Sequence, residues 1–372
     1  MSRIVLAMSG GVDSSVAAHL LRKAGHDVIG VFMRHGETSP VACANPNAAQ
    51  SADLPVLSPR LDHKQGCCSA SDAEDARRVA DRLDIPFYAL NLESEFGRIM
   101  DYFTQEYTVG RTPNPCVMCN NWIKFGKLFD YADSVGAEFV ATGHYAQLIN
   151  SEAGQPPQLL RGLDADKDQS YVLFGIGRQY LSRMLLPVGM FQKPEIRALA
   201  GDLGLRVADK RDSQEICFVT SGKHDEFVRA RREPVDTSGD IVTTSGEVVG
   251  KHEGIERYTI GQRRGLRVAL GDPRYVVRIE PDTRRVVLGE KHELAREELT
   301  ANQTNWLTDP PGDSFACAAQ IRYNSSAQAA KATVLAGGRL HVAFEDPCFG
   351  VAPGQAVVLY DGDRVLGGGW IE

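Results

Sequence analysis

Hydrophobic positions in the first third of the chain form short apolar runs that alternate with helix-like segments. Four runs predict strands, at Ile4–Met8, Val28–Met33, Phe87–Leu92 and Phe139–Thr142. Four segments predict helices, at Ser14–Ala24, Ser71–Leu83, Phe96–Tyr107 and Trp122–Ala132. The second of these opens with a capping box, Ser71 to Glu74. Strands and helices in alternation favour a parallel sheet with helices on both faces.

The pattern changes after about residue 212, where short alternating runs are separated by Gly, Pro and Asp turns. These runs predict strands at Asp240–Thr243, Tyr275–Ile279, Arg285–Leu288, Ala316–Ile321, His341–Phe344, Ala356–Tyr360 and Val365–Gly367. We therefore expect three domains: an α/β parallel-sheet domain at 1–211, a small β-rich linking domain at 212–283 and a C-terminal β-barrel at 284–372. Segment 36–64, rich in Pro, Ala, Ser and Asn, is expected to be a surface insertion.

Length and composition are those of a globular protein with more than one domain. The chain has 372 residues, of which 43% are hydrophobic and 24% charged, and one compact core rarely holds so many residues. The first residues lack the basic-then-apolar pattern of a signal peptide. No apolar run is long enough to span a bilayer. We therefore expect a cytoplasmic protein without a membrane partner.

The net charge is −7, which argues against a protein that coats nucleic acid indiscriminately. An enzyme that gathers its basic residues on one face is still compatible with this charge. Two basic clusters are candidates for such a face: Lys223, Arg229, Arg231 and Arg232, and Lys251, Arg257, Arg263, Arg264 and Arg267. Solvated surface is the plainer explanation of such clusters.

Eight cysteines are present, and in a cytosolic protein they should be reduced. They are then buried thiols, metal ligands or catalytic groups rather than a disulfide framework. We interpret Cys67 and Cys68 as structural, and Cys43, Cys317 and Cys348 as ordinary buried or half-buried thiols. Cys116, Cys119 and Cys217 lie in motifs and are the candidates for chemistry.

The most informative motif is Ser9-Gly-Gly-Val-Asp-Ser-Ser15, directly after a predicted strand and directly before a predicted helix. Its glycines allow a tight turn, and its N–H groups and serine hydroxyls at the helix N-terminus form an anion site. It lacks the G-x-x-x-x-G-K-[ST] pattern of a Walker A loop. A Gly/Ser turn without a ligand is the alternative interpretation.

Two further positions follow predicted strands, at the edge where a parallel sheet binds nucleotides. Met33 ends the second strand and could pack on an adenine, although a core position is the commoner role of such a Met. Gly143 follows the fourth strand and gives room for backbone approach, and His144 comes next.

Two cysteine motifs lie further along. In Gly110-Arg-Thr-Pro-Asn-Pro-Cys-Val-Met-Cys-Asn-Asn121, two prolines predict a rigid turn that holds Cys119 near the start of a helix, where the helix dipole lowers the pKa of a thiol. The other motif is Asp212-Ser-Gln-Glu-Ile-Cys-Phe218. A joint role for Cys119 and Cys217 requires the fold to bring them together.

These motifs resemble a known family. SGGVDSS resembles the pyrophosphate loop (PP-loop) of the ATP pyrophosphatases, which split ATP into AMP and pyrophosphate while adenylating a substrate. The bacterial tRNA 2-thiouridylases show the same motifs in the same order: SGGVDSS, GRTPNP…CN…IKF, ATGHYA, KDQSY, DSQEICF, YTIGQR, IRY and APGQ. The resemblance covers nearly the whole chain except segment 36–64.

The resemblance implies an ATP-dependent, tRNA-modifying transferase. ATP with Mg²⁺ on Asp13 would adenylate O2 of the wobble uridine. The sulfur source would be a sulfur-carrier protein or sulfide donor. A carrier would deliver a persulfide to Cys217, and Cys119 would release the sulfur by forming a disulfide with Cys217. By the same matching ATP would contact Ala7, Met8, Ser9, Gly10, Gly11, Val12, Asp13, Ser14, Met33 and Gly143.

The resemblance also implies that the linking domain at 212–283 binds tRNA, and it implies which residues elsewhere meet the RNA. Asn114, Pro115 and Cys116 would frame the flipped-out base. The tRNA, by resemblance one of those for Lys, Glu and Gln, would contact His144, Lys167, Asp168, Gln169, Arg322, Tyr323 and Gln355. Unstacked anticodon bases are what proteins usually read in RNA.

Position 116 departs from the family, whose better-known members have Asp after the Asn-Pro pair. Cys116, Cys119 and Cys217 are one thiol short of a closed zinc site. They would suit a 4Fe–4S cluster with one open iron able to hold sulfide. Two hypotheses therefore stay open: a persulfide–disulfide cycle on Cys119 and Cys217, or a cluster held by all three cysteines.

Two other classes of function compete with tRNA thiolation. A pyrophosphatase-type ligase for a small acid explains the loop but gives the cysteine motifs no role. A non-catalytic RNA-binding protein explains the β-rich second half but not the loop beside a CxxC motif. Release of pyrophosphate from ATP that depends on tRNA would separate the three.

Overall fold

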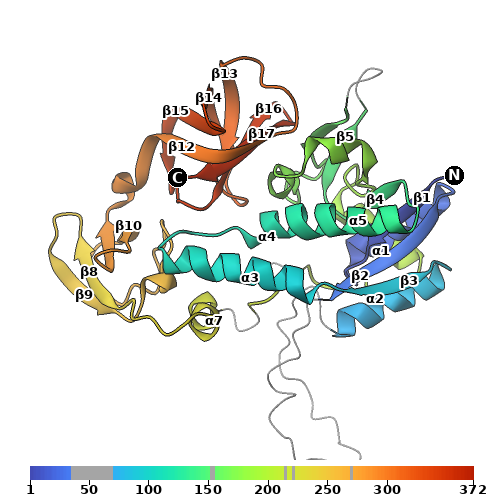
Figure 1. Ribbon diagram of the computed structural model, residues 1–372, viewed down its shortest axis with the longest axis horizontal. Coiled ribbons are helices and arrows are strands. Elements are labelled where there is room, and N and C mark those ends of the chain that lie inside the picture. The colour runs from blue at the N-terminus through green and yellow to red at the C-terminus, as the bar shows by residue number, and fades with distance from the viewer. Residues whose placement is uncertain (35–69, 151–155, 213–215, 220–222, 269–270) are drawn as a thin grey trace, which may run out of the picture.

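The computed structural model describes residues 1–34, 70–150, 156–212, 216–219, 223–268 and 271–372 (Figure 1). The predicted insertion at 36–64 and the thiols Cys43, Cys67 and Cys68 lie outside these described residues.

The N-terminal sheet has five parallel strands in the order β3-β2-β1-β4-β7. Their bounds are β1 Arg3–Ala7, β2 Asp27–Arg34, β3 Phe87–Asn91, β4 Phe139–Ala141 and β7 Met184–Leu185. In the register of the central strand, Ile4 lies opposite Val28 on one side and Phe139 on the other. The predicted parallel sheet is confirmed, with β7 as a strand that the sequence pattern did not indicate.

Both faces of this sheet are covered, because successive side chains of a strand point to opposite sides. Val5 and Ala7 join a core with α3 (Glu93–Thr108) and α5 (Leu128–Ser134). Ile4, Leu6 and Met8 join the opposite core with α1 (Val12–Lys23), α2 (Ala70–Arg82) and α6 (Lys193–Asp202). The expectation of helices on both faces is therefore confirmed. Helix α2 includes Ser71 in its first turn, so the capping box expected to begin there is displaced.

The segment predicted as one helix at Trp122–Ala132 is longer and irregular. It consists of α4 (Pro115–Met118), a π-helical stretch η2 (Cys119–Lys127) with a kink at Phe125, and then α5. The Asn114 side chain accepts a hydrogen bond from the N–H of Val117, and Pro115 occupies the first helical position. Both are standard helix-start signals, and they agree with the helix start that the Pro-rich turn predicts near Cys119.

The second part of the chain begins with α7 (His224–Arg231) and a four-stranded sheet in the order β10-β11-β8-β9. The strands are β8 Gly239–Thr243, β9 Val248–His252, β10 Tyr275–Glu280 and β11 Arg285–Gly289. Glu256 is fully buried beside this sheet and accepts hydrogen bonds from Arg229, Arg232 and Thr237. Its buried charge is thus compensated by two guanidinium groups.

The C-terminal part is a barrel of six strands, closed because β12 pairs with β17 as well as with β15. The strands are β12 Ala295–Trp306, β13 Ser314–Gln320, β14 Gln328–Leu335, β15 Arg339–Phe349, β16 Ala356–Asp361 and β17 Arg364–Ile371. The predicted barrel is confirmed, although the pattern did not indicate β9, β12 or β14. A hairpin of the N-terminal part, β5 (Ala146–Ile149) and β6 (Gln158–Arg161), extends the barrel sheet through Leu160 opposite Arg364.

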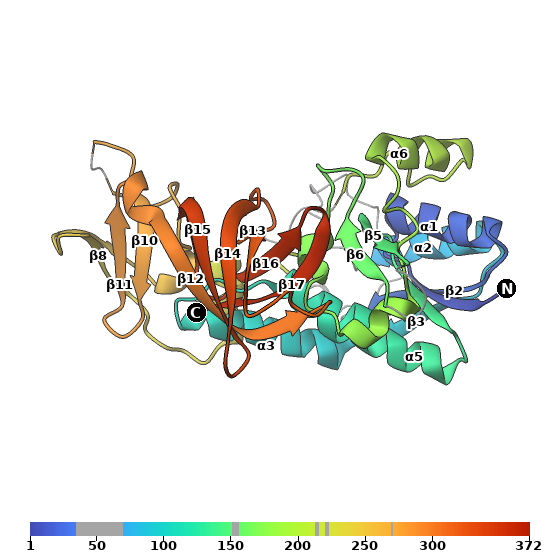
Figure 2. The same cartoon turned by 90° about the horizontal axis from the view of Figure 1, so that it is seen from above.

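Helix α3 connects the parts. In both views it runs from the N-terminal sheet toward the β8–β11 sheet, with the barrel alongside (Figures 1 and 2). It contacts α4, η2, α7 and the short helix η5 (Ile255–Arg257). The remaining short helices are η3 Ser170–Leu173, η4 Arg178–Arg183 and η6 Lys291–Leu294. None of the helices in the described part of the chain is long and apolar enough to cross a membrane.

Candidate active site

The loop between β1 and α1 has the geometry of an anion site. Gly10 has φ +72°, and a Cβ at this position would overlap the carbonyl oxygen of Asp72, so only glycine fits. Gly11 is the N-cap of α1 and provides no side chain to cap it. The N–H groups of the first turn are therefore left for an incoming anion, and the helix dipole favours one there.

The serine hydroxyls of the loop have different hydrogen-bond partners. Ser14 Oγ accepts from the N–H of Ser9 at 3.2 Å and lies 3.2 Å from the carbonyl oxygen of Gly11. Ser15 is fully buried and donates to that same carbonyl at 2.8 Å. Ser15 thus stabilises the turn, and Ser9 and Ser14 are the hydroxyls at the loop itself.

The sheet order places Gly143 against this loop. Strand β1 connects through α1 to β2 on one side, whereas β4 lies on its other side, so the carboxyl ends of β1 and β4 form the point where nucleotides bind in such sheets. A Cβ on Gly143 would lie 2.7 Å from the backbone nitrogen of Ser14 and 2.9 Å from the carbonyl carbon of Asp13. Met33, at the end of β2, is 7% exposed and packs in the core on the α3 side, as does Ala7.

Gly143→Ala is expected to weaken ATP binding by about ten- to a hundredfold, because an overpacked methyl group costs about 1–3 kcal/mol and here it presses on the loop backbone. Gly201→Ala is the matched control, since Gly201 lies in α6 of the same domain and a Cβ there meets nothing within 4 Å. Equilibrium binding of a non-hydrolysable ATP analogue measures both. Equal affinities of the two variants would contradict the placement of ATP at the loop beside Gly143.

Asp13 lies in the first turn of α1, and its carboxylate is held by two distant side chains. Lys193 Nζ is 2.7 and 2.9 Å from the two carboxylate oxygens, and the Tyr145 hydroxyl donates to one of them at 2.7 Å. Burial and the carboxylate of Asp13 raise the pKa of Tyr145, so this hydroxyl stays protonated. Sequence reasoning did not identify Lys193, because a single lysine at a helix start has no distinguishing spacing.

Lys193 extends this contact into a charged network. It also pairs with Asp212 at 2.8 Å, and Lys167 pairs with the other oxygen of Asp212 at 2.8 Å. Burial opposes ionisation of Asp212, but hydrogen bonds from Lys167 and Lys193 outweigh it and lower its pKa. Lys167, expected at the RNA, and Asp212, from the second cysteine motif, thus both lie in the network around the loop aspartate.

A second lysine, Lys210, joins the loop to helix α2. Lys210 Nζ donates to the carbonyl of Gly10 at 2.9 Å and to Asp72 and Asp75 at 2.6 and 2.7 Å. Burial alone would depress the pKa of Lys210, but the hydrogen bonds to the two carboxylates raise it. The loop backbone is therefore fixed to α2 by a charged lysine.

His144 is buried behind the loop rather than exposed. Its Nδ1 lies 2.7 Å from Thr142 Oγ1, and its Nε2 lies 3.3 Å from Lys124 Nζ. Burial and the Lys124 charge keep the pKa of His144 well below its ordinary value. Since an ammonium group can only donate, Nε2 is the acceptor and Nδ1 carries the proton. The imidazole is neutral and links the first cysteine segment to β4.

Helix α3 packs against both cysteine segments. It contacts α4 and η2, which carry Cys116 and Cys119, and the Phe103 ring meets the Phe218 ring next to Cys217 at 5.2 Å. Cys116 is exposed, whereas Cys119 and Cys217 are half-buried against the same hydrophobic core. Residues 213–215 and 220–222, on either side of Cys217, lie outside the described part.

The barrel holds the turn that precedes Cys116. Gln355 Nε2 donates to the carbonyls of Thr112 and Pro113, both at 3.0 Å, and the N–H of Thr112 donates to Pro353 at 2.8 Å. Nearby, the hydroxyl of Tyr171 donates to the carbonyl of Ala356 at 2.9 Å. Gln355 was expected at the RNA, and its amide N–H groups are here used inside the protein.

Of the other residues expected at the RNA, Asp168, Gln169 and Arg322 make bonds inside the protein, whereas Tyr323 is exposed. Asp168 pairs with Arg161 at 2.8 Å and accepts from the backbone of Gly162 and Ser170, while Gln169 accepts from the N–H of Tyr145. Arg322 donates to two backbone carbonyls. Tyr323 is 41% exposed, and burial together with the charges of Asp168 and Cys116 raises its pKa. Of these, Tyr323 offers an accessible ring.

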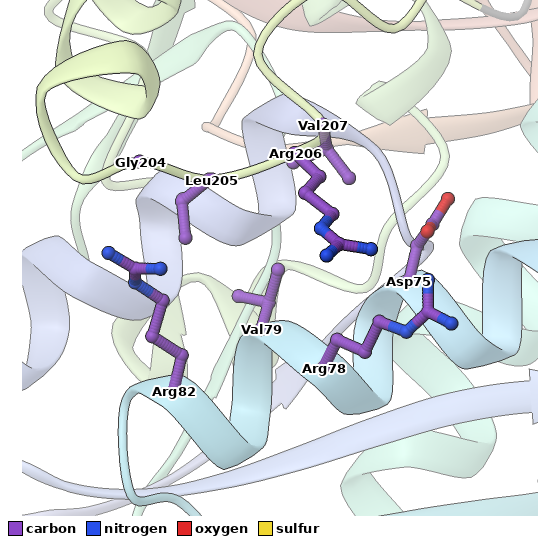
Figure 3. Close-up of a pocket in the computed structure, with 8 residues that line it drawn as sticks. All are labelled: Asp75, Arg78, Val79, Arg82, Gly204, Leu205, Arg206 and Val207. Carbon is purple, nitrogen blue, oxygen red and sulfur yellow. The ribbon is translucent and has the colours of Figure 1, made fainter.

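A separate cavity of about 460 Å³ lies between α2 and the segment after α6 (Figure 3). Its lining residues are Asp75, Arg78, Val79, Arg82, Gly204, Leu205, Arg206 and Val207. In the close-up, the side chains from α2 face those of the 204–207 segment. None of the predicted site residues lines this cavity, so it is distinct from the candidate active site.

The described residues contain no group of three or more His, Cys, Asp or Glu side chains placed to hold a metal ion. Cys116, Cys119 and Cys217 as arranged are therefore not a preformed ligand set. At Asp13, Lys193 and Tyr145 take three of the roughly four acceptor positions of the carboxylate. One position remains, which fits a single bond to a Mg²⁺ that is held mainly by phosphate oxygens.

Three family descriptions match consecutive parts of the chain. Residues 2–221 match the tRNA methyl transferase HUP domain, residues 225–290 the tRNA methyl transferase PRC-barrel domain and residues 296–371 the aminomethyltransferase beta-barrel domain. The curated relatives include the tRNA-specific 2-thiouridylase MnmA of Rhodopirellula baltica, 58% identical over 100% of this chain and 96% of that protein. The proteins of the same name from Geobacter metallireducens and Geotalea uraniireducens are 46% and 44% identical, again over 100% of this chain and 96% and 95% of theirs.

Proposed function

The chain belongs to the tRNA-specific 2-thiouridylase family, and we propose that it uses ATP to replace O2 of the wobble uridine in tRNA by sulfur. The family descriptions speak of methyl transfer, but an ATP-type anion loop and two cysteine segments against one helix suit thiolation. The observation that carries the proposal is this arrangement: α3 packs against the segments of Cys119 and Cys217, and Lys124 and His144 join the first of them to the sheet edge beside the loop.

ATP is proposed to bind with its phosphates on the first turn of α1 and its α-phosphate toward Gly143. When the bond between the α-phosphorus and the bridging oxygen breaks, negative charge builds up on the leaving pyrophosphate. A nearby cation stabilises that charge. Lys193 is 7% exposed, already lies at Asp13 and is the candidate for this role. Mg²⁺, where bound, neutralises phosphate charge, and Asp13 would supply one oxygen to it.

The target base is proposed to enter beside Asn114, Pro115 and Cys116. Asn114 is buried and its Oδ1 caps α4, so this turn is rigid before any RNA arrives. Gln355 fixes the same turn from the barrel. The exposed Tyr323 ring, 6.3 Å from the Tyr171 ring, could stack on an unpaired base. His144, Asp168 and Gln169 make hydrogen bonds inside the protein, so they would act on the RNA by positioning other residues rather than through free side chains.

The proposed reaction has three steps: adenylation of the uridine, attack by the persulfide sulfur and release of the sulfur from Cys217. The uridine O2 attacks the α-phosphorus of ATP, and pyrophosphate leaves. The terminal sulfur of a persulfide on Cys217 attacks C2, and AMP departs with the former O2. The Cys119 thiolate attacks Sγ of Cys217, which breaks the bond to the transferred sulfur and forms a Cys119–Cys217 disulfide. An external thiol reductant restores both thiols, and a sulfur-carrier protein that bears a persulfide reloads Cys217 by passing its terminal sulfur to the Cys217 thiolate, which leaves the carrier as a thiol.

The experiment that tests the function combines two readouts on the purified protein. Transcripts of tRNAs for Lys, Glu and Gln are incubated with ATP and a labelled sulfur donor, and both pyrophosphate and 2-thiouridine are measured. Thiolation requires both to depend on tRNA. Pyrophosphate release with a small acid and without tRNA would instead identify a small-molecule ligase, and binding of tRNA with neither product would identify a non-catalytic RNA-binding protein.

Cys116 separates the persulfide cycle from the cluster hypothesis. The cycle needs two thiols, and the described residues hold no three-residue ligand set, so we expect anaerobically purified, iron-free protein to thiolate tRNA when ATP, Mg²⁺, a persulfide-level sulfur donor and a thiol reductant are supplied. Cys116→Ser is expected to stay within about threefold of wild type. Cys116→Asp, which restores the residue usual in the family, should be at least as active. The control is the same protein reconstituted with iron and sulfide.

Rescue of inactive iron-free protein by iron and sulfide, together with loss of that rescue in Cys116→Ser, would overturn the persulfide cycle in favour of a 4Fe–4S cluster. The iron content and visible absorption of the reconstituted protein report on the cluster independently of activity.

A further inference from the structure

The basic residues of the middle region divide into two kinds. Four of the arginines in the two sequence clusters are used within the protein. Arg231 pairs with Asp101 at 2.8 Å, Arg232 and Arg229 pair with the buried Glu256 at 3.3 and 2.7 Å, and Arg257 pairs with Asp225 at 3.1 Å. Reversing these charges would disturb the fold, so they are poor candidates for an RNA surface.

Arg263, Arg264 and Arg267 are of the other kind. All three are exposed, and within the part of the chain that the structure describes none of them makes an ion pair. They lie within five positions of one another on the segment Ile260–Val268, which we call the arginine loop. In a chain of net charge −7, three adjacent arginines without acidic partners form a local positive patch.

The arginine loop has a defined backbone. Gly261, Gly265 and Arg267 have φ of +85°, +76° and +56°. The N–H of Gly261 donates to the carbonyl of Val276 and the N–H of Val276 donates back to Gln262, at 2.8 and 3.0 Å. Gln262 Nε2 donates to the carbonyl of Arg264 at 3.0 Å. The loop is therefore tied to β10 by backbone hydrogen bonds.

The arginine loop is joined through Arg322 to the part of the barrel that carries Tyr323, the residue proposed to stack on the base. Arg322 donates to the carbonyl of Ile260 at 2.8 Å and to that of Gly350 at 2.7 Å. Its partial burial lowers its pKa, and it serves as a bridge between the middle sheet and the barrel. The ring of the next residue, Tyr323, lies 6.3 Å from that of Tyr171, whose hydroxyl donates to the carbonyl of Ala356, directly after Gln355. The arginine loop and the target base would thus contact neighbouring parts of one substrate.

We propose that the arginine loop binds phosphate groups of the tRNA backbone next to the target uridine, through Arg263, Arg264 and Arg267. This inference rests on the proposed function and adds where the RNA backbone lies. Guanidinium groups match phosphate oxygens in a two-pronged geometry. Phosphate contacts position an RNA without reading its sequence, so the loop contributes affinity and orientation, and base recognition stays with the Asn114–Cys116 turn.

The test is the salt dependence of tRNA binding to the full chain. The triple variant Arg263→Gln, Arg264→Gln, Arg267→Gln is expected to bind tRNA at least about tenfold more weakly near 0.1 M salt. It should also lower the slope of log K against log salt by about two to three, since each phosphate contact contributes about 0.7 to 0.9. A triple Lys variant, which keeps the charges, should keep most of the slope.

The matched control removes three exposed charges from helices α1 and α2, by Arg22→Gln, Lys23→Gln and Arg77→Gln. It should leave the slope unchanged. Binding of an ATP analogue and the unfolding temperature should be the same in all variants. If wild type thiolates tRNA but the loop variant and the control have the same slope, the arginine loop is ordinary surface. If wild type itself neither binds nor thiolates tRNA, the proposed function fails first, which is a different result.

Discussion

Cys217→Ser and Cys119→Ser are each expected to lower tRNA thiolation by more than about a thousandfold, the scale seen when a covalent nucleophile is removed. A serine hydroxyl can neither hold a persulfide nor resolve one. Because both residues lie against the α3 core and not on the nucleotide loop, tRNA-dependent release of pyrophosphate should continue at first turnover. Measuring both products in single-turnover reactions separates sulfur transfer from adenylation.

Cys317→Ser is the control for these variants. Cys317 is half-buried in the barrel, and its burial raises its pKa to about 11, so it is a protonated thiol at neutral pH. Its replacement should leave thiolation within about twofold of wild type, since only thiolates are nucleophilic enough to take part. Thiolation by Cys119→Ser at the wild-type rate would show that this thiol does not release the sulfur.

Asp13→Ala should abolish pyrophosphate release, with a loss of at least about a hundredfold. A Mg²⁺ on the phosphate groups would lose one oxygen ligand, and Lys193 would lose the carboxylate that holds it in place. Lys193→Met should give a similar loss and should weaken inhibition by added pyrophosphate. Tyr145 and Asp212 remain in both variants, so the unfolding temperature should fall by only a few degrees. The assay is pyrophosphate formation at saturating tRNA.

Asp27→Ala provides the comparison for Asp13→Ala. Asp27 is also a paired carboxylate of the same domain, but its partner Arg3 and the pair itself are exposed at the start of β2. Exposed ion pairs contribute about 1 kcal/mol or less, so this variant should be active. Near wild-type pyrophosphate release by Asp13→Ala would show that the loop is not the pyrophosphate site.

Local patterns in the sequence determined much of the fold and the nature of the site. The run Ile4–Met8, the glycines Gly10 and Gly11 and the following helical spacing are contiguous, and the structure has β1, loop and α1 in that order. The period of apolar residues depends only on neighbours along the chain, so strands and helices of the first third and most strands of the second half were predictable. The sequence alone also singled out Cys119, Cys217 and Asp13.

Only the tertiary structure decided which of these residues meet. Lys193 reaches Asp13 across 180 positions, and Gln355 reaches the turn before Cys116 across 243. The closing of β12 on β17 likewise joins residues far apart. The same packing separates Arg232, bound to a buried Glu256, from the exposed Arg263, although both look alike in a basic cluster. Partner choice depends on distances and burial in space, which spacing along the chain does not encode.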